Sequence, residues 1–194
     1  MIPLVSPELD RYLIERLPDR HPVIAEMEAF ATERDVPIVG PAVATLLGIL
    51  ARSIGARRVC ELGSAIGYST AFFAQAVGPG GSVLYTDGDE RNARRAEGYL
   101  DRLNLRDRVE IRVGEAVGIL EASSGDFDVV FIDIDKDAYP QALEAASACG
   151  PAGISSPTMS SGRARSSTRQ SGTARRRGSV SSTAVFSRGA TSNP

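Results

Sequence analysis

The chain has 194 residues, of which 42% are hydrophobic and 24% are charged, and its formal net charge is −2. This composition is ordinary for one soluble globular domain. No apolar run reaches membrane-spanning length, no basic start and apolar core mark a signal peptide, and two cysteines cannot build a disulfide framework. We therefore expect a cytoplasmic protein that does not bind membranes.

Charge is spread unevenly along the chain. Residues 151–194 contain seven arginines and neither aspartate nor glutamate, so residues 1–150 carry 15 basic and 24 acidic side chains. The first part is an acidic domain without the basic patch that nucleic-acid binding requires. We expect no nucleic-acid partner.

The first predicted elements are three helices. Leu9, Leu13 and Leu17 recur at helical spacing after Ser6, a residue type that suits an N-cap, and Pro41 suits a first helical turn. The predicted helices cover residues 7–17, 21–34 and 41–54.

From residue 57 onward, strand and helix patterns alternate. We predict strands over residues 57–61, 82–86, 109–113 and 128–132, with helices over residues 68–77, 90–103, 115–122 and 138–148. This alternation is typical of an α/β fold with a doubly wound, Rossmann-like parallel sheet, in which ligands bind beyond the carboxyl ends of the strands. Cys60 lies in the first strand and is expected to be a small core residue.

The segment VCELGSAIGYST at residues 59–70 has the features of an adenosyl-cofactor loop. Gly63 and Gly67 allow close approach of backbone to a ligand, and Asp87, one strand later, can accept two hydrogen bonds from a ribose diol. An ordinary strand-to-helix turn is the alternative interpretation. The glycine spacing does not match G-x-G-x-x-G, and Glu61 would repel a phosphate, which counts against a nucleotide-dependent oxidoreductase. Glu61 suits a cationic ligand such as S-adenosylmethionine.

At this point the chain resembles the class I methyltransferases, specifically the bacterial O-methyltransferases similar to caffeoyl-CoA and catechol O-methyltransferases. The motifs that carry the resemblance are PIVGPA at 37–42, ELGSAIGYST at 61–70, TDGDE at 86–90, GEA at 114–116 and FIDIDKDAY at 131–139. The expected cofactor is S-adenosylmethionine, and its expected contacts are Val39, Glu61, Gly63, Ser64, Ser69, Asp87, Ala116 and Asp133. The resemblance also implies a homodimer for a chain with an intact C-terminus.

The DIDKD sequence at residues 133–137 is the second predicted site. A solvated loop of paired charges is the alternative. In the resembled family the first aspartate binds a divalent metal and the lysine lies near the acceptor hydroxyl, which here implies a metal ligand at Asp133 and a catalytic role for Lys136. A Mg²⁺, Mn²⁺ or Ca²⁺ ion would hold a phenolic, catecholic or CoA-linked hydroxyl and lower its pKa. Methyl transfer to that oxygen would follow.

Residues 149–194 differ in character from the rest of the chain. The stretch 151–194 has twelve serines and seven arginines, no leucine, and no helical or strand periodicity. One interpretation is a disordered basic tail, which would fit an inactive cofactor-binding or interaction protein. The genetic code offers another. If the reading frame is shifted from Ala148, the last base of each codon joins the first two bases of the next codon. The shifted codons can then encode LRPGGYLITDNVLWSG. This sequence resembles the family's next segment, including an Asp-Asn metal pair near 158–159.

We therefore predict an O-methyltransferase domain over residues 1–148, with N-terminal helices over 1–55 and a core over 56–148, and a shifted reading frame over 149–194. The family's C-terminal strands would then be missing or replaced, and the activity of this chain is in doubt. We expect the tail to contribute no strand to the sheet.

Overall fold

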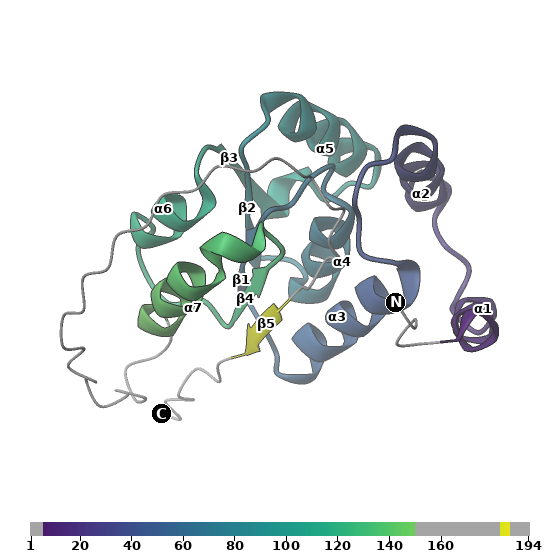
Figure 1. Cartoon of the computed structure of the whole chain (residues 1–194), viewed down its shortest axis with the longest axis horizontal. Coiled ribbons are helices and arrows are strands. Elements are labelled where there is room, and N and C mark those ends of the chain that lie inside the picture. Colours follow the sequence, from purple (N-terminus) through teal and green to yellow (C-terminus); the bar gives the residue numbers. More distant parts are fainter. Residues whose placement is uncertain (1–5, 150–182, 187–194) are drawn as a thin grey trace, which may run out of the picture.

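The structure of the protein is a computed structural model that describes residues 6–149 and 183–186 (Figure 1). One sheet with the strand order β3-β2-β1-β4-β5 forms its centre. The first four strands pair in parallel, whereas β5 runs antiparallel to β4. The strands are β1 (Arg58–Leu62), β2 (Ser82–Asp87), β3 (Val109–Val113), β4 (Val129–Ile132) and β5 (Thr183–Phe186).

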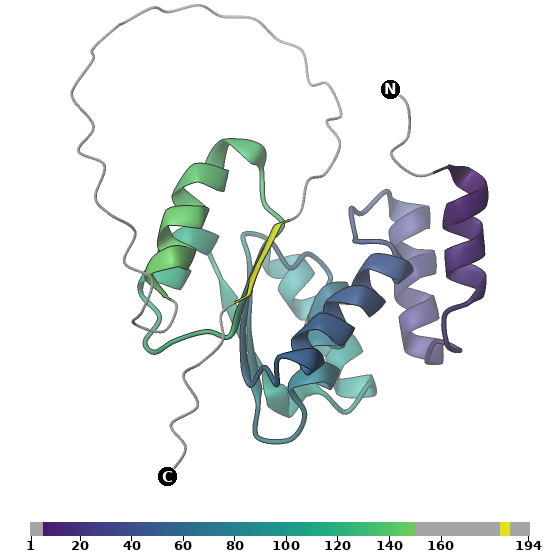
Figure 2. The same cartoon turned by 90° about the horizontal axis from the view of Figure 1, so that it is seen from below.

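Helices cover both faces of this sheet (Figure 2). α3 (Pro41–Ser53), α4 (Tyr68–Val77) and α5 (Glu90–Arg102) contribute to one buried cluster, and α6 (Ala116–Glu121) and α7 (Tyr139–Ala148) contribute to the other. The predicted doubly wound α/β fold is confirmed. The remaining helical elements are α1 (Pro7–Glu15), α2 (Pro22–Arg34), and the 3₁₀ turns η1 (Arg106–Arg108) and η2 (Lys136–Ala138).

The N-terminal helices begin where capping residues predict. The Ser6 hydroxyl accepts a hydrogen bond from the amide of Leu9 at 3.2 Å, as an N-cap should. The imidazole of His21 accepts one from the amide of Val23, so α2 begins at Pro22, one residue later than predicted. None of the helices in the described residues has the length and apolar character that a membrane crossing requires.

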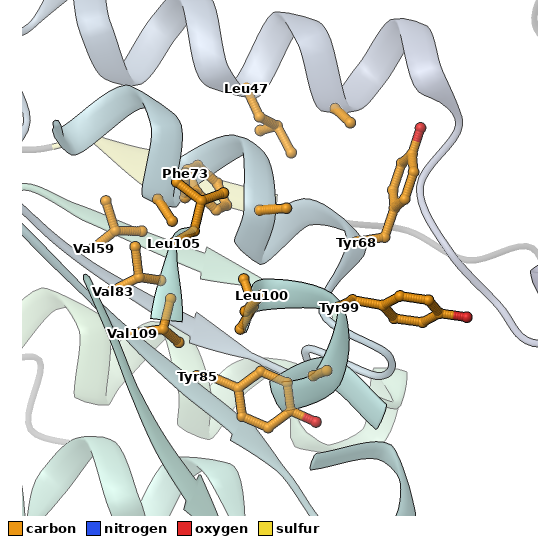
Figure 3. Packing of buried hydrophobic residues seen from close by; sticks show 14 of the residues in the cluster. Leu47, Val59, Tyr68, Phe73, Val83, Tyr85, Tyr99, Leu100, Leu105 and Val109 are labelled. Atoms are coloured by element: carbon orange, nitrogen blue, oxygen red, sulfur yellow. The ribbon is translucent and has the colours of Figure 1, made fainter. Parts of the chain in front are cut away.

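The larger hydrophobic cluster fixes α3, α4 and α5 against the sheet (Figure 3). Phe73 of α4 and Phe131 of β4 are both buried, and their ring centroids lie 5.6 Å apart. Cys60 is fully buried, as predicted, and burial raises the pKa of its thiol. A buried side chain of Phe size stabilises a fold by about 1.5–3 kcal/mol, so this cluster contributes substantially to the stability of the fold.

One prediction about the C-terminal region is wrong. Residues 183–186 form β5 and pair with β4 from Val129 to Ile132, whereas the tail was expected to contribute no strand. The physical reason lies in β4, which would otherwise be an edge strand with unpaired backbone groups. The segment TAVF has no charge and no proline, and it contains β-branched and aromatic residues that favour strands. The other predictions for residues 150–182 and 187–194 lie outside the described residues.

Candidate cofactor and acceptor site

Glu61 provides a buried negative charge near the end of β1. Its side chain is fully buried, and the hydroxyls of Ser69 and Thr70, in the first turn of α4, each donate a hydrogen bond to one of its carboxylate oxygens. Burial raises the pKa of Glu61 to about 7, although the hydroxyl donors lower it. Desolvation therefore outweighs hydrogen bonding, and the carboxylate would gain from a cationic partner. Thr70 was not among the predicted site residues.

The loop after β1 needs glycine at two positions. Gly63 has a φ of +84°, and a Cβ there would overlap the carbonyl oxygen of Asp133 at the end of β4. Gly67 has a φ of +80°, and a Cβ there would lie 2.8 Å from the Cβ of Ala96 in α5. These glycines let the loop pass directly against β4 and α5, as well as giving it left-handed backbone conformations.

Asp87 lies at the end of β2, and backbone and side-chain donors fix its carboxylate. One oxygen accepts from the amide of Ala65 at 2.9 Å, and the other accepts from the amide of Asp89 at 2.8 Å and the side-chain amide of Asn92 at 3.1 Å. The Tyr85 hydroxyl donates to the Ala65 carbonyl at 2.6 Å. The carboxylate thus has a defined orientation before any ligand binds. Asn92 and Tyr85 were missed because their partners lie on other elements.

Three further predicted contacts lie around the same edge of the sheet. The Ser64 hydroxyl is buried, donates to the carbonyl of Glu61 at 3.4 Å and accepts from the amide of Thr86 at 3.2 Å. Val39 is buried in the segment between α2 and α3, and Ala116 is the first residue of α6. The Gly114 amide donates to the carbonyl of Asp87 at 3.0 Å, which brings the end of β3 beside the end of β2.

Asp133 and Lys136 follow β4 in a more open environment. The Asp133 amide donates to the carbonyl of Leu62 at 2.8 Å, so its backbone is tied to the end of β1. The Asp133 side chain is half-buried, whereas Lys136 is exposed as the first residue of η2. The fold therefore brings Asp133 to the glycine loop through its backbone.

The described residues do not complete a metal site. Within residues 6–149 and 183–186, no three histidine, cysteine, aspartate or glutamate side chains gather in a group that could hold a metal ion. A hard cation such as Mg²⁺ needs about six oxygen ligands, several of which can be water, but rarely stays on one carboxylate alone. The described residues therefore do not fit a resident metal by themselves.

The chain resembles known proteins over its described domain. A family model for O-methyltransferases matches residues 15–147. Catechol O-methyltransferase of Mycobacterium tuberculosis is 35% identical over 134 residues, which are 68% of this chain and 61% of that protein. Caffeoyl-CoA O-methyltransferase 1 of Zea mays is 31% identical over 99 residues, which are 48% of this chain and 38% of that protein. The chain thus spans less than two thirds of the length of these relatives.

Solved structures agree in fold. The O-methyltransferase from Bacillus cereus in complex with SAH has a TM-score of 0.68 and 31% identity, and the match covers 73% of this chain and 67% of that one. TomG from Streptomyces achromogenes in complex with SAM has a TM-score of 0.68 and 28% identity, with 73% and 66% of the chains covered. The family match covers more than half of the sequence, and the sheet and its glycine loop agree with it. The chain belongs to the O-methyltransferase family.

Proposed function

We propose that residues 6–149 form the cofactor-binding part of an S-adenosylmethionine-dependent O-methyltransferase. The observation that carries this proposal is the convergence of Glu61, Asp87 and Asp133 on one edge of the sheet, around a loop whose glycines contact β4 and α5. Relatives crystallised with SAH or SAM support the choice of cofactor. The acceptor that we propose is a small phenolic, catecholic or CoA-linked hydroxyl, because the related proteins are named for catechol and caffeoyl-CoA.

The two ends of the cofactor make different interactions, one by charge and the other by hydrogen bonds. Glu61 faces the cationic methionine end, where an ammonium and a sulfonium offset the cost of its burial. Asp87 accepts hydrogen bonds from the ribose hydroxyls, and its orientation is already set by three donors. Gly63, Ser64 and Ser69 line the loop between them, and Val39 and Ala116 supply backbone contacts.

In the reaction that we propose, the acceptor oxygen attacks the sulfonium methyl in line. A C–O bond forms as the C–S bond breaks, the bonding electrons stay on sulfur as a neutral thioether, and the acceptor proton must leave. Lys136 either takes this proton or stabilises the phenolate by its charge. Asp133 lies beside the cofactor loop and orients the acceptor side. Positioning of the two reactants supplies much of the rate.

We propose that the divalent-metal site is completed only by residues that a shifted reading frame would encode. Two observations support a frame change near Ala148. The family match ends at residue 147, and the chain matches only 61% of the length of its catechol O-methyltransferase relative. The shifted frame permits an Asp-Asn pair that would join Asp133. Pairing of β5 with β4 counts against this proposal, because a shifted reading frame predicts no strand in residues 149–194.

A second candidate function is an inactive cofactor-binding or interaction protein that uses its basic tail. This alternative rests on the incomplete metal-ligand set among the described residues, whereas the family match supports the first candidate. An experiment can distinguish the two candidate functions, because the second predicts cofactor affinity without methyl transfer. Cytoplasmic localisation stays a prediction.

We propose a second copy of this chain as the partner of an apolar face on α1 and α3. Tyr12 on α1 is 53% exposed, and Leu46 and Ile49 on α3 are 52% and 50% exposed. Large exposed apolar side chains that gather in one patch are typical of interaction surfaces. We expect Leu46→Asp to convert a homodimer into a monomer in light-scattering measurements. A wild-type chain that is already monomeric would remove this proposal.

Isothermal titration with S-adenosylmethionine tests the proposed function. We expect binding by the wild-type chain and an affinity loss of about 10- to 100-fold in Asp87→Ala, because hydrogen bonds to a charged partner contribute about 1.5–3 kcal/mol. Asp107→Ala is the matched control, since this aspartate lies in η1 away from the loop. Equal affinity of the Asp87 variant and the wild type would remove Asp87 from the site.

A further inference from the structure

Tyr68 lies where the cofactor loop ends and helix α4 begins. It is the first residue of α4, follows the left-handed Gly67 and precedes Ser69, which hydrogen bonds to Glu61. The residue is 1% exposed. Figure 3 shows its hydroxyl turned away from the aliphatic cluster around Val59 and Leu100. The hydroxyl therefore points to a partner outside the core.

That partner is Glu28 of helix α2. The Tyr68 hydroxyl donates to a carboxylate oxygen of Glu28 at 2.6 Å, and the guanidinium of Arg20 lies 3.1 Å from the same oxygen. Burial and the neighbouring Glu28 carboxylate raise the pKa of Tyr68. Tyr68 consequently stays protonated and acts as the donor, while Arg20 balances the charge of the acceptor.

Helix α2 also makes an ion pair and a cation–π contact, and both lead to α5 instead of the cofactor loop. Glu26 forms a bidentate ion pair with Arg102, with nitrogen–oxygen distances of 2.8 and 2.6 Å. The guanidinium of Arg95 lies 4.0 Å from the centroid of the Phe30 ring. Among the hydrogen bonds and ion pairs described for α2, the Tyr68–Glu28 bond is thus the one that reaches the start of α4.

The end of α2 leads directly into another wall of the proposed pocket. The helix ends at Arg34, Asp35 turns the chain with a φ of +53°, and the following segment carries the buried Val39. The position of α2 therefore sets where this segment lies relative to the loop that begins at Gly63. The Tyr68–Glu28 hydrogen bond links the two walls, in addition to their packing in the larger hydrophobic cluster.

We infer that Tyr68 and Glu28 are positioning residues that hold the Val39 segment against the glycine loop around the methionine end of the cofactor. This inference rests on the proposed function. It adds that the N-terminal helix α2 takes part in cofactor affinity through a contact of its own. Because Tyr68 is adjacent to the Glu61 partner Ser69 and is not among the donors that fix Asp87, the effect falls on the methionine end and spares the nucleoside end.

Titrations with two ligands separate this role from general loosening of the fold. The probes are S-adenosylhomocysteine, which has the amino-acid end, and adenosine, which lacks it. We expect Tyr68→Phe and Glu28→Ala to weaken S-adenosylhomocysteine binding about five- to tenfold, while adenosine binding changes by less than about twofold. Glu28→Gln keeps an oxygen acceptor for the hydroxyl and should rescue binding to within about twofold of wild type.

Glu26→Gln is the matched control, because it weakens the docking of α2 to α5 without touching Tyr68. We expect it to lower the melting temperature and to leave both affinities unchanged. Equal loss for both ligands in Tyr68→Phe, or the same loss in Glu26→Gln, would overturn the inference. A wild-type chain that binds neither ligand would instead contradict the proposed function itself.

Discussion

The two ends of the proposed pocket differ in how completely this chain builds them. At the ends of β1 and β2, Glu61 is fully buried between two hydroxyl donors and Asp87 accepts three hydrogen bonds. After β4, Lys136 is exposed, and the described residues hold no complete group of metal ligands. Cofactor binding therefore depends chiefly on residues 61–92 and on the Val39 segment, whereas the acceptor side depends on parts of the fold further along the chain.

We expect the largest effect from substitution of Lys136, and we expect it on turnover and not on cofactor affinity. In a version with the reading frame restored after Ala148, Lys136→Ala should lower turnover by about 100-fold or more, since positioned acid–base groups contribute about 10²–10⁴. Cofactor affinity should stay near wild type, because the lysine lies on the acceptor side. Turnover measured with labelled S-adenosylmethionine and a catechol separates the two quantities. Full activity of the variant at every pH would reduce Lys136 to a loop charge.

A smaller but still large effect concerns the packing of the glycine loop. Gly63→Ala should destabilise the fold by about 3 kcal/mol, because the new Cβ overlaps the Asp133 carbonyl and the residue must keep a positive φ. Gly55→Ala is the control, since Gly55 also has a positive φ of +67° but no atom within 4 Å of the added Cβ. Denaturant unfolding should give the control a loss of only about 1–2 kcal/mol. Equal losses would show that the contact with Asp133 has no effect.

The buried carboxylate gives a pH dependence with opposite signs for folding and binding. The pKa of Glu61 is raised from about 4.5 to about 7, so the folded state holds more protons than the unfolded state between these values. Stability of the cofactor-free protein should therefore fall as pH rises from about 4.5 to about 7, and level off above. Affinity for S-adenosylmethionine should rise over the same range, by up to about tenfold per pH unit.

Glu61→Gln tests this pH dependence. Both slopes should flatten in the variant, because the amide does not titrate. The measurements are unfolding free energies and titrations at pH 5, 6, 7 and 8, about one unit apart. An affinity profile that keeps its slope in Glu61→Gln would assign the titration to another group.

The smallest expected effect is on the exposed surface of α5. Glu90 and Arg94 form an ion pair at 2.8 Å, one helical turn apart, and each side chain is 68% exposed. Glu90→Ala should change the free energy of unfolding by about 0.5 kcal/mol or less and leave cofactor affinity unaltered. The change in this surface variant is the reference with which the larger changes at Gly63 and Glu61 are compared.

The sequence predicted the parts of the site that depend on local patterns. Strand periodicity placed Glu61 and Asp87 at strand ends, and glycine at 63 and 67 indicated a close-packed loop; the structure has both features. Partners that lie far apart in the chain could not be predicted, and Tyr68 with Glu28 is the clearest case. Strand β5 was missed for a different reason, because its pairing depends on the free edge of β4 more than on any pattern in residues 183–186.

The most direct test of the difference between the two ends compares this chain with its frame-restored counterpart. Both proteins are titrated with S-adenosylmethionine and assayed for methyl transfer to a catechol with Mg²⁺. We expect cofactor affinities within about threefold of each other, since residues 1–148 are identical in the two proteins, and methyl transfer only by the restored protein. Loss of cofactor binding in the present chain alone, or methyl transfer by it at the restored rate, would show that the two ends of the pocket do not differ in this way.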